Sequence, residues 1–239
     1  MRSASPFRRF FSRLALPLAV VAGTPASIPA QALAQELRVG FQLVTRADDA
    51  GLAEGTAILF YRGPIAYPIA ENLREITHSL PAAVTTVLLD LDSDGGELDD
   101  TERVIAVLKD LRGRLRLETR VRHGAHCLSA CVPIFMQGVR RSAGGASVWM
   151  LHGACVAHTN VPGTAATYRY VQMLRDAGIA ESFLCDLARK GVFREPGRYW
   201  LSGHELFAHA NAGVITDLIP AWQPENPQTP PFDPNIRAR

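Results

Sequence analysis

The sequence predicts an α/β fold: a single domain with a mainly parallel sheet covered by helices. Short, nearly continuous apolar runs alternate with longer amphipathic segments, which is the pattern of parallel strands joined by helices. The chain has 239 residues, of which 47% are hydrophobic and 20% charged, so it can bury one sizeable core. We place this domain at residues 55–220, after a lead-in segment over residues 35–54.

The predicted elements alternate along the domain in the order that a parallel sheet requires. The apolar runs expected to form strands are residues 56–61, 85–91, 115–121 and 146–151. The segments expected to form helices are residues 65–80, 98–111, 130–137 and 164–190. A final segment over residues 201–218 is expected to form a helix that closes with a short strand.

The first 34 residues have the composition of a secretory signal peptide. Four arginines, at positions 2, 8, 9 and 13, precede an apolar run over residues 14–23, and small residues lead to Ala32-Leu33-Ala34. The apolar run has about half of the roughly 20 residues that span a bilayer, so we expect cleavage after Ala34 and no retained transmembrane anchor. The paired arginines also resemble a twin-arginine export signal. We therefore expect an exported protein, located in the periplasm.

The charge of the mature chain and the prolines of its C-terminal segment give two further expectations. Removal of four arginines and no acid takes the formal net charge from +2 to −2, so the mature protein lacks the cationic surface that binds nucleic acid. The arginines within residues 112–122 are expected to lie on a solvated strand face. Residues 221–239 contain five prolines, which cannot continue a helix or a central strand, and are predicted to form a flexible tail.

Three local motifs at strand ends carry the candidate chemistry. Gly95 and Gly96 follow a predicted strand and lead into a helix, where backbone N–H groups suit a developing oxyanion. Ser129 begins the short apolar helix, and His152 directly follows the next predicted strand. Taken singly, each motif has an ordinary structural explanation as a tight turn, an N-cap serine or a structural histidine.

Together, the three motifs resemble the proteolytic subunit of the Clp protease and its wider crotonase-like superfamily. That family has a double-glycine oxyanion turn, then a serine at a helix start, then a histidine after the following strand. Gly95 and Ser129 are 34 positions apart here, and Ser129 and His152 are 23 positions apart, close to the family's separations. The later segments Tyr199-Trp200-Leu201-Ser202 and Gly213-Val214-Ile215-Thr216-Asp217 also look like the family's C-terminal element. The resemblance covers roughly residues 55–220 and implies a spiral of ββα units.

The resemblance implies a serine protease or related hydrolase that acts on a peptide or protein. Ser129 would be the nucleophile and His152 the general base, while the N–H groups of Gly96 or Gly95 and of Ala130 would hold the oxyanion. No cofactor is implied. The family forms rings, so a homo-oligomer is an open expectation. We expect no ATPase partner, because an exported chain has no ATP supply.

The third catalytic position departs from the family pattern. The family's aspartate, which orients the histidine, should precede Ser202 by about eight positions, and this position holds Arg194. The neighbouring Glu195 is our candidate for this role, with Asp186 behind it.

The cysteines are a second departure from the family pattern. Cys127, Cys131, Cys155 and Cys185 all lie in the mature part, and an oxidising compartment favours disulfides. Two bridges would allow three connectivities. A bridge between Cys127 and Cys131 would stiffen the turn that carries Ser129, and Cys155 could then reach Cys185. The alternative is buried free thiols.

Three other functions are compatible with parts of this pattern. Signal-peptide peptidases share this fold but use a serine–lysine pair, and neither Lys109 nor Lys190 lies at an evident base position. A catalytically silent binding or scaffold protein on the same fold is the main alternative, since fold alone does not decide function. An acyl-CoA enzyme is disfavoured, because coenzyme A thioesters are not expected outside the cytoplasm. The histidines lack a recognisable zinc spacing, so no metal is expected.

Overall fold

The structure is a computed structural model, and it describes residues 39–44, 52–154, 163–194 and 197–221. The predicted signal peptide, Cys155, Glu195 and all but the first residue of the predicted tail lie outside these residues.

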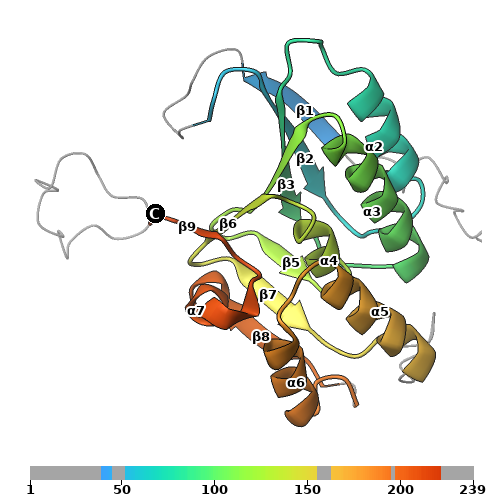
Figure 1. Cartoon of the computed structure of the whole chain (residues 1–239), viewed down its shortest axis with the longest axis vertical. Helices are drawn as coiled ribbons and strands as arrows, with labels where there is room; N and C mark the ends of the chain where they lie inside the picture. Colours follow the sequence, from blue (N-terminus) through green and yellow to red (C-terminus); the bar gives the residue numbers. More distant parts are fainter. Residues whose placement is uncertain (1–38, 45–51, 155–162, 195–196, 222–239) are drawn as a thin grey trace, which may run out of the picture.

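A mainly parallel six-stranded sheet forms the larger layer of the molecule (Figure 1). Its strands, in spatial order, are β1 (Val39–Val44), β2 (Thr56–Arg62), β3 (Thr86–Asp92), β4 (Arg116–Val121), β6 (Arg140–Gly144) and β9 (Asp217–Ile219). Within this sheet, β2, β3, β4, β6 and β9 run parallel to one another. The edge strand β1 pairs with β2 in the antiparallel direction. The predicted α/β fold with a mainly parallel sheet is confirmed.

A second, three-stranded sheet lies beside the C-terminal end of β3. Its order is β5 (His126–Leu128), β7 (Val148–Leu151) and β8 (Tyr199–Ser202), with β5 and β7 parallel and β8 antiparallel to β7. Ser93 joins the two sheets: its N–H donates to the His126 carbonyl at 2.9 Å, and its carbonyl accepts from Leu128 N–H at 2.9 Å. The end of β3 is therefore fixed against β5.

Helices cover one face of the large sheet and continue down one side of the molecule (Figure 1). They are α2 (Ile69–His78), α3 (Leu98–Arg112), α4 (Cys131–Phe135), α5 (Thr164–Asp176) and α6 (Glu181–Arg189). The helix α7 (Gly203–Ala208), followed by a 3-10 turn over Ala210–Ala212, lies on the other side, next to β9 (Figure 1). None of these helices has the length and apolar character needed to cross a bilayer.

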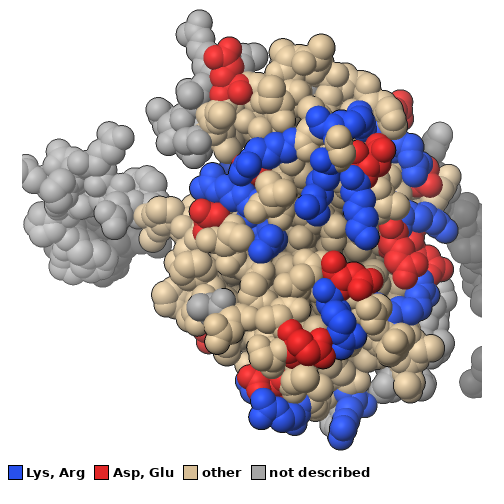
Figure 2. All heavy atoms as spheres, viewed as in Figure 1, with Lys and Arg blue, Asp and Glu red and all other residues tan. Residues whose placement is uncertain are grey.

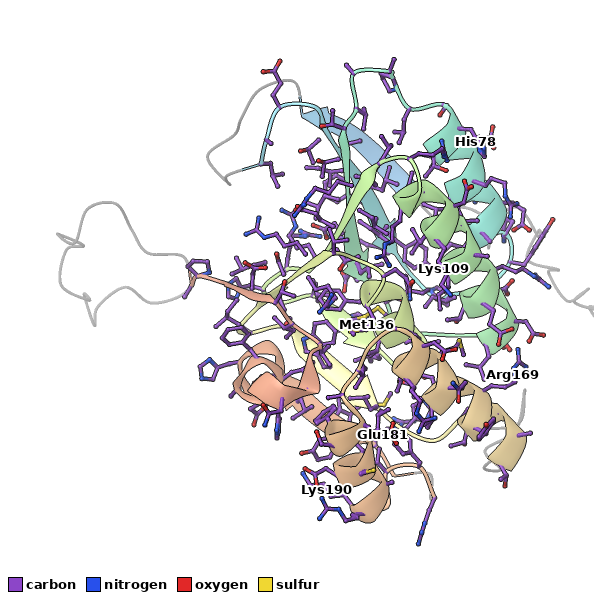
Figure 3. All side chains as sticks on the ribbon, viewed as in Figure 1. His78, Lys109, Met136, Arg169, Glu181 and Lys190 are labelled. Carbon is purple, nitrogen blue, oxygen red and sulfur yellow. A yellow bond between two sulfur atoms is a disulfide. The ribbon has the colours of Figure 1, made fainter. Side chains whose placement is uncertain are left out.

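Part of the core lies between the large sheet and α2 and α3, and the same core continues under α4, α5 and α6. Alternate side chains of the central strands are buried there: Ala57, Leu59 and Tyr61 on β2, and Val87, Leu89 and Leu91 on β3. Arg169 on α5 fastens this layer to the next helix, because it binds Asp99 at 2.7 Å and Glu102 at 2.8 Å near the start of α3 (Figure 3). The helices α3 and α5 are thus held together near the end of β3.

The opposite face of the large sheet carries arginines paired with acids. Lys and Arg side chains gather in the upper half of the face in Figure 2, with Asp and Glu among them. On β4, Arg120 and Arg122 bind Asp90 at 2.7 and 2.8 Å, although Asp90 is only 1% exposed. Buried charge is tolerated when it is paired in this way. The expected solvated strand face of arginines holds only in part, because Arg112 ends α3 and Arg114 lies in the following turn. The arginines on and directly after β4 pair with acids, and Arg120 is largely buried.

Several elements differ from the sequence prediction. The predicted lead-in segment contains the strand β1. The strands β5 and β6 were not predicted, because β5 has only three residues and β6 is the polar run Arg140–Gly144, and neither shows apolar alternation. The helical region over residues 164–190 is two helices. They separate at Gly178, whose φ of +91° lies in the left-handed region that glycine adopts without a steric cost.

Candidate active site

Ser129 and His152 form the centre of the candidate site. The Ser129 hydroxyl oxygen and His152 Nε2 are 2.7 Å apart. Ser129 lies between β5 and α4, and His152 directly follows β7. Because β5 and β7 are parallel neighbours, their C-terminal ends meet, and Ser129 N–H extends the ladder by donating to the Met150 carbonyl at 2.8 Å. The two residues predicted as nucleophile and base are within hydrogen-bond distance.

The backbone of Ser129 is strained. Its φ of +52° makes it the one non-glycine residue with a positive φ in the described part of the chain. An L-residue adopts this region at a cost of about 1 to 2 kcal/mol. Its side chain does not cap the following helix, since α4 has Ala130 as its N-cap residue and no side-chain cap bond. The ordinary reading of Ser129 as an N-cap serine is therefore wrong.

Two contacts hold this strained turn. A disulfide joins Cys127 to Cys131, with Cα atoms 5.2 Å apart, so it closes a five-residue ring with Ser129 at the middle position. The predicted bridge between these two cysteines is confirmed. Tyr170, fully buried on α5, donates its hydroxyl to the Ser129 carbonyl at 3.1 Å, and burial raises the pKa of this phenol. Tyr170 therefore remains a hydrogen-bond donor at neutral pH.

The double glycine lies directly against Ser129. A Cβ on Gly95 would lie 2.5 Å from the Leu128 carbonyl oxygen and 2.9 Å from Ser129 Cβ, and φ at Gly95 is +87°, so only glycine fits. Gly95 N–H donates to the Ser93 hydroxyl at 3.2 Å. The N–H groups of Gly96 and Ala130 have no acceptor among the described residues. Of the two glycines, Gly96 is therefore the better candidate for donating its N–H to an oxyanion.

The surroundings of His152 favour its neutral form. Burial lowers the pKa of His152 below its usual value, and the nearby Arg198 cation lowers it further, while a backbone hydrogen bond at Gly153 acts in the opposite direction. A neutral imidazole can accept a proton from the Ser129 hydroxyl. The lowered pKa is compatible with the predicted role of His152 as a general base.

An acid that orients His152 was not found among the described residues. Glu195, the sequence candidate, lies outside them. Asp186, the second candidate, is directed elsewhere: it lies on α6 and pairs with Arg189 one turn later on the same helix. None of the ion pairs among described residues joins His152 to a carboxylate.

Two residues near the site were missed by sequence reasoning. Tyr170 lies in the middle of a long amphipathic helix, where nothing in the sequence separates it from an ordinary core residue. Arg198 precedes β8, and its position depends on the antiparallel pairing of β8 with β7, which the sequence did not predict.

The remaining predicted cysteines do not form a second bridge in the described part of the chain. Cys185 on α6 has a free thiol and is exposed, so the alternative of buried thiols does not describe it. Cys155 lies outside the described residues.

The fold and site define a class of protein: a mainly parallel α/β domain with a serine–histidine pair where two sheets meet. No protein-family model matches the chain, and no curated protein matches its sequence. Among solved structures, a point mutant of ClpP1 from Listeria monocytogenes is similar, with a TM-score of 0.53 and 15% sequence identity. The match covers 68% of this chain and 90% of that chain. The chain therefore has a ClpP-like fold, and at this identity the likeness extends to the fold alone.

The lowered pKa of His152 predicts how the reactivity of Ser129 depends on pH. The base must be neutral, so labelling of Ser129 by a fluorophosphonate probe should be constant above neutral pH and decline in acid, with a midpoint below 6.5. Labelling rates measured from about pH 4 to pH 8 give this midpoint. A midpoint above 6.5 would contradict the assigned environment of His152.

The Cys127–Cys131 bridge is predicted to maintain the reactive conformation of Ser129. In a variant with Cys127→Ser and Cys131→Ser, Ser129 would be free to leave the left-handed region of φ. The rate of labelling by the probe should then fall by roughly tenfold. Cys185→Ser, which removes the exposed free thiol, is the matched control and should label normally. Circular dichroism would check that both variants are folded. Unchanged labelling of the folded double variant would show that the bridge is dispensable.

Proposed function

We propose that this protein is an exported serine hydrolase that acts on peptides or proteins, with Ser129 as nucleophile and His152 as general base. The observation that carries the proposal is the 2.7 Å contact between the Ser129 hydroxyl and His152 Nε2, made by a serine with a φ of +52°. A strained residue of this kind is common at functional sites and uncommon in a merely structural turn.

The proposed reaction is acyl transfer. His152 Nε2 accepts the hydroxyl proton while Ser129 Oγ bonds to the substrate carbonyl carbon, whose electron pair moves onto oxygen. The N–H groups of Gly96 and Ala130 are the proposed donors to this oxyanion; loss of one such donor typically costs about 10²-fold to 10³-fold in rate. Collapse of the intermediate expels the amine or alcohol, which takes the proton from His152. Water then repeats the sequence and releases the acid.

A catalytically silent binding or scaffold protein is the second candidate. One observation favours it: Arg194 occupies the position where the family pattern calls for an aspartate, and the described residues provide no carboxylate for His152. An imidazole without an orienting acid is still a base, so this difference predicts a slower enzyme rather than an inactive one. Assembly into a homo-oligomer rests on the family resemblance alone and stays a proposal.

The catalytic pair is tested by substitution. Ser129→Ala should abolish fluorophosphonate labelling and hydrolysis, because the nucleophile is lost while Cβ and the backbone are retained. His152→Ala should cause nearly the same loss, because nucleophile and base act as one unit. Ser182→Ala, at an exposed position on α6, is the control and should behave as the native protein. Mass spectrometry of the labelled peptide would identify the modified serine.

Two results would overturn the hydrolase proposal. One is a folded native protein that does not react with the probe. The other is labelling that persists in folded Ser129→Ala. Either result would leave the silent scaffold as the better account of this fold.

Export is tested separately. Its support is the arginine-rich start, the apolar run and the small residues before Gln35, together with a disulfide that an oxidising compartment would preserve. Protein isolated from the cell envelope should begin at or near Gln35 when its N-terminus is sequenced. A cytoplasmic protein with Met1 intact would rule out export.

A further inference from the structure

The edge strand β8 places charged and aromatic side chains beside the candidate site. Its antiparallel register sets Trp200 opposite Met150 and Ser202 opposite Val148. Side chains alternate along a strand, so residues two positions apart share a face. The last pair of this register is Leu151 with Tyr199. When the register is extended by one more pair, Arg198 lies opposite His152, on the same face of β8 as Trp200. Directly opposite residues have Cβ atoms about 5 Å apart, within reach of a long side chain.

Arg198 has no acidic partner among the described residues. It is exposed, and its charge acts on the His152 ring across the strand pair. The arginines elsewhere are used differently: Arg120 and Arg122 neutralise Asp90, and Arg169 clamps α3. A guanidinium that no acid among the described residues neutralises can bind a carboxylate through two parallel hydrogen bonds.

Acidic side chains lie on the other side of the Ser129–His152 pair, next to the double glycine. On β5, His126 binds Asp92 at 2.9 Å and Asp94 at 3.0 Å, and Asp94 immediately precedes the double glycine. Asp92 also pairs with Arg62 at 3.6 Å. Asp94, whose side chain is 78% exposed, is therefore the acid that a peptide across Ser129 would meet on the glycine side, with Arg198 on the β8 side. The charge distribution favours an acidic residue at one side of the scissile bond and disfavours it at the other.

An apolar surface adjoins Arg198. Trp200 is 49% exposed and Val148 is 42% exposed, and both lie on the outward face of the small sheet with Met150 between them. An exposed tryptophan is a common anchor for a bound peptide, because its ring offers a large rigid apolar area. The surface next to the cation can therefore hold an apolar side chain.

We propose that Arg198 is a specificity-determining residue that binds a substrate carboxylate on the β8 side of the scissile bond, with Trp200 contacting a neighbouring apolar side chain. The substrates are accordingly peptides with an acidic residue close to the cleaved bond. This inference rests on the proposed hydrolase function and adds the substrate class.

The first test uses peptide pairs with one shared sequence that differ only in Asp or Asn at a single position. The position is moved along both sides of the scissile bond, and kcat/KM is measured for each pair. We expect a preference for Asp of about tenfold at a position on one side only, weakened by added salt. Arg198→Gln should reduce this ratio to about one, and Arg198→Glu should instead favour Lys there. The matched control is Arg74→Gln, at an exposed position on α2. It removes the same charge far from β8, so this variant should keep the preference for Asp.

A pH profile separates recognition from general damage to the fold. Removing the Arg198 cation raises the pKa of His152, so the acid limb of labelling in Arg198→Gln should move to higher pH. The other charged groups near the site, His126, Asp92 and Asp94, are unchanged in this variant. An acid limb identical to the native one would contradict the placement of Arg198 opposite His152.

A binding measurement separates failure of this inference from failure of the hydrolase proposal. Fluorescence anisotropy with Ser129→Ala reports binding of the same Asp and Asn peptides without turnover. A native enzyme that cleaves the peptides with no preference for Asp at any position would overturn the role of Arg198 and leave the hydrolase intact. A protein that never reacts but binds Asp peptides more tightly, in a way that Arg198→Gln abolishes, would overturn the hydrolase and support the carboxylate site.

Discussion

The left-handed conformation of Ser129 is the constraint on which the rest of the site depends. An L-residue leaves this conformation unless its neighbours prevent it. Here the Cys127–Cys131 ring fixes the turn on both sides, and Tyr170 holds the Ser129 carbonyl from α5. The absence of a side chain at Gly95 is part of the same arrangement, since any Cβ there would collide with the turn. The position of the Ser129 side chain therefore depends on the backbone geometry of this turn.

The electrostatic field around His152 differs from that of a familiar triad. In a triad, a carboxylate stabilises the imidazolium and raises its pKa. Around His152, burial and the Arg198 cation lower the pKa. Both effects disfavour the imidazolium and favour the neutral imidazole.

Much of the fold and the central pair could be predicted because they leave local signals. Apolar runs marked β2, β3 and β7, and the spacing of Gly95, Ser129 and His152 marked the turns between elements. The strands β5 and β6 left no such signal, since short or polar segments become strands only through their neighbours. Arg198 and Tyr170 were missed for the same reason: their positions are set by pairing and packing between segments far apart in the chain.

The helix α5 touches both halves of the candidate site through two consecutive residues. Arg169 grips Asp99 and Glu102 at the start of α3, directly after the double glycine, and Tyr170 holds the carbonyl of Ser129. The turn that carries Ser129 and the start of α3 after the double glycine therefore both contact the same helix. A shift of α5 along its axis would therefore alter contacts at the double-glycine turn and at the Ser129 turn together.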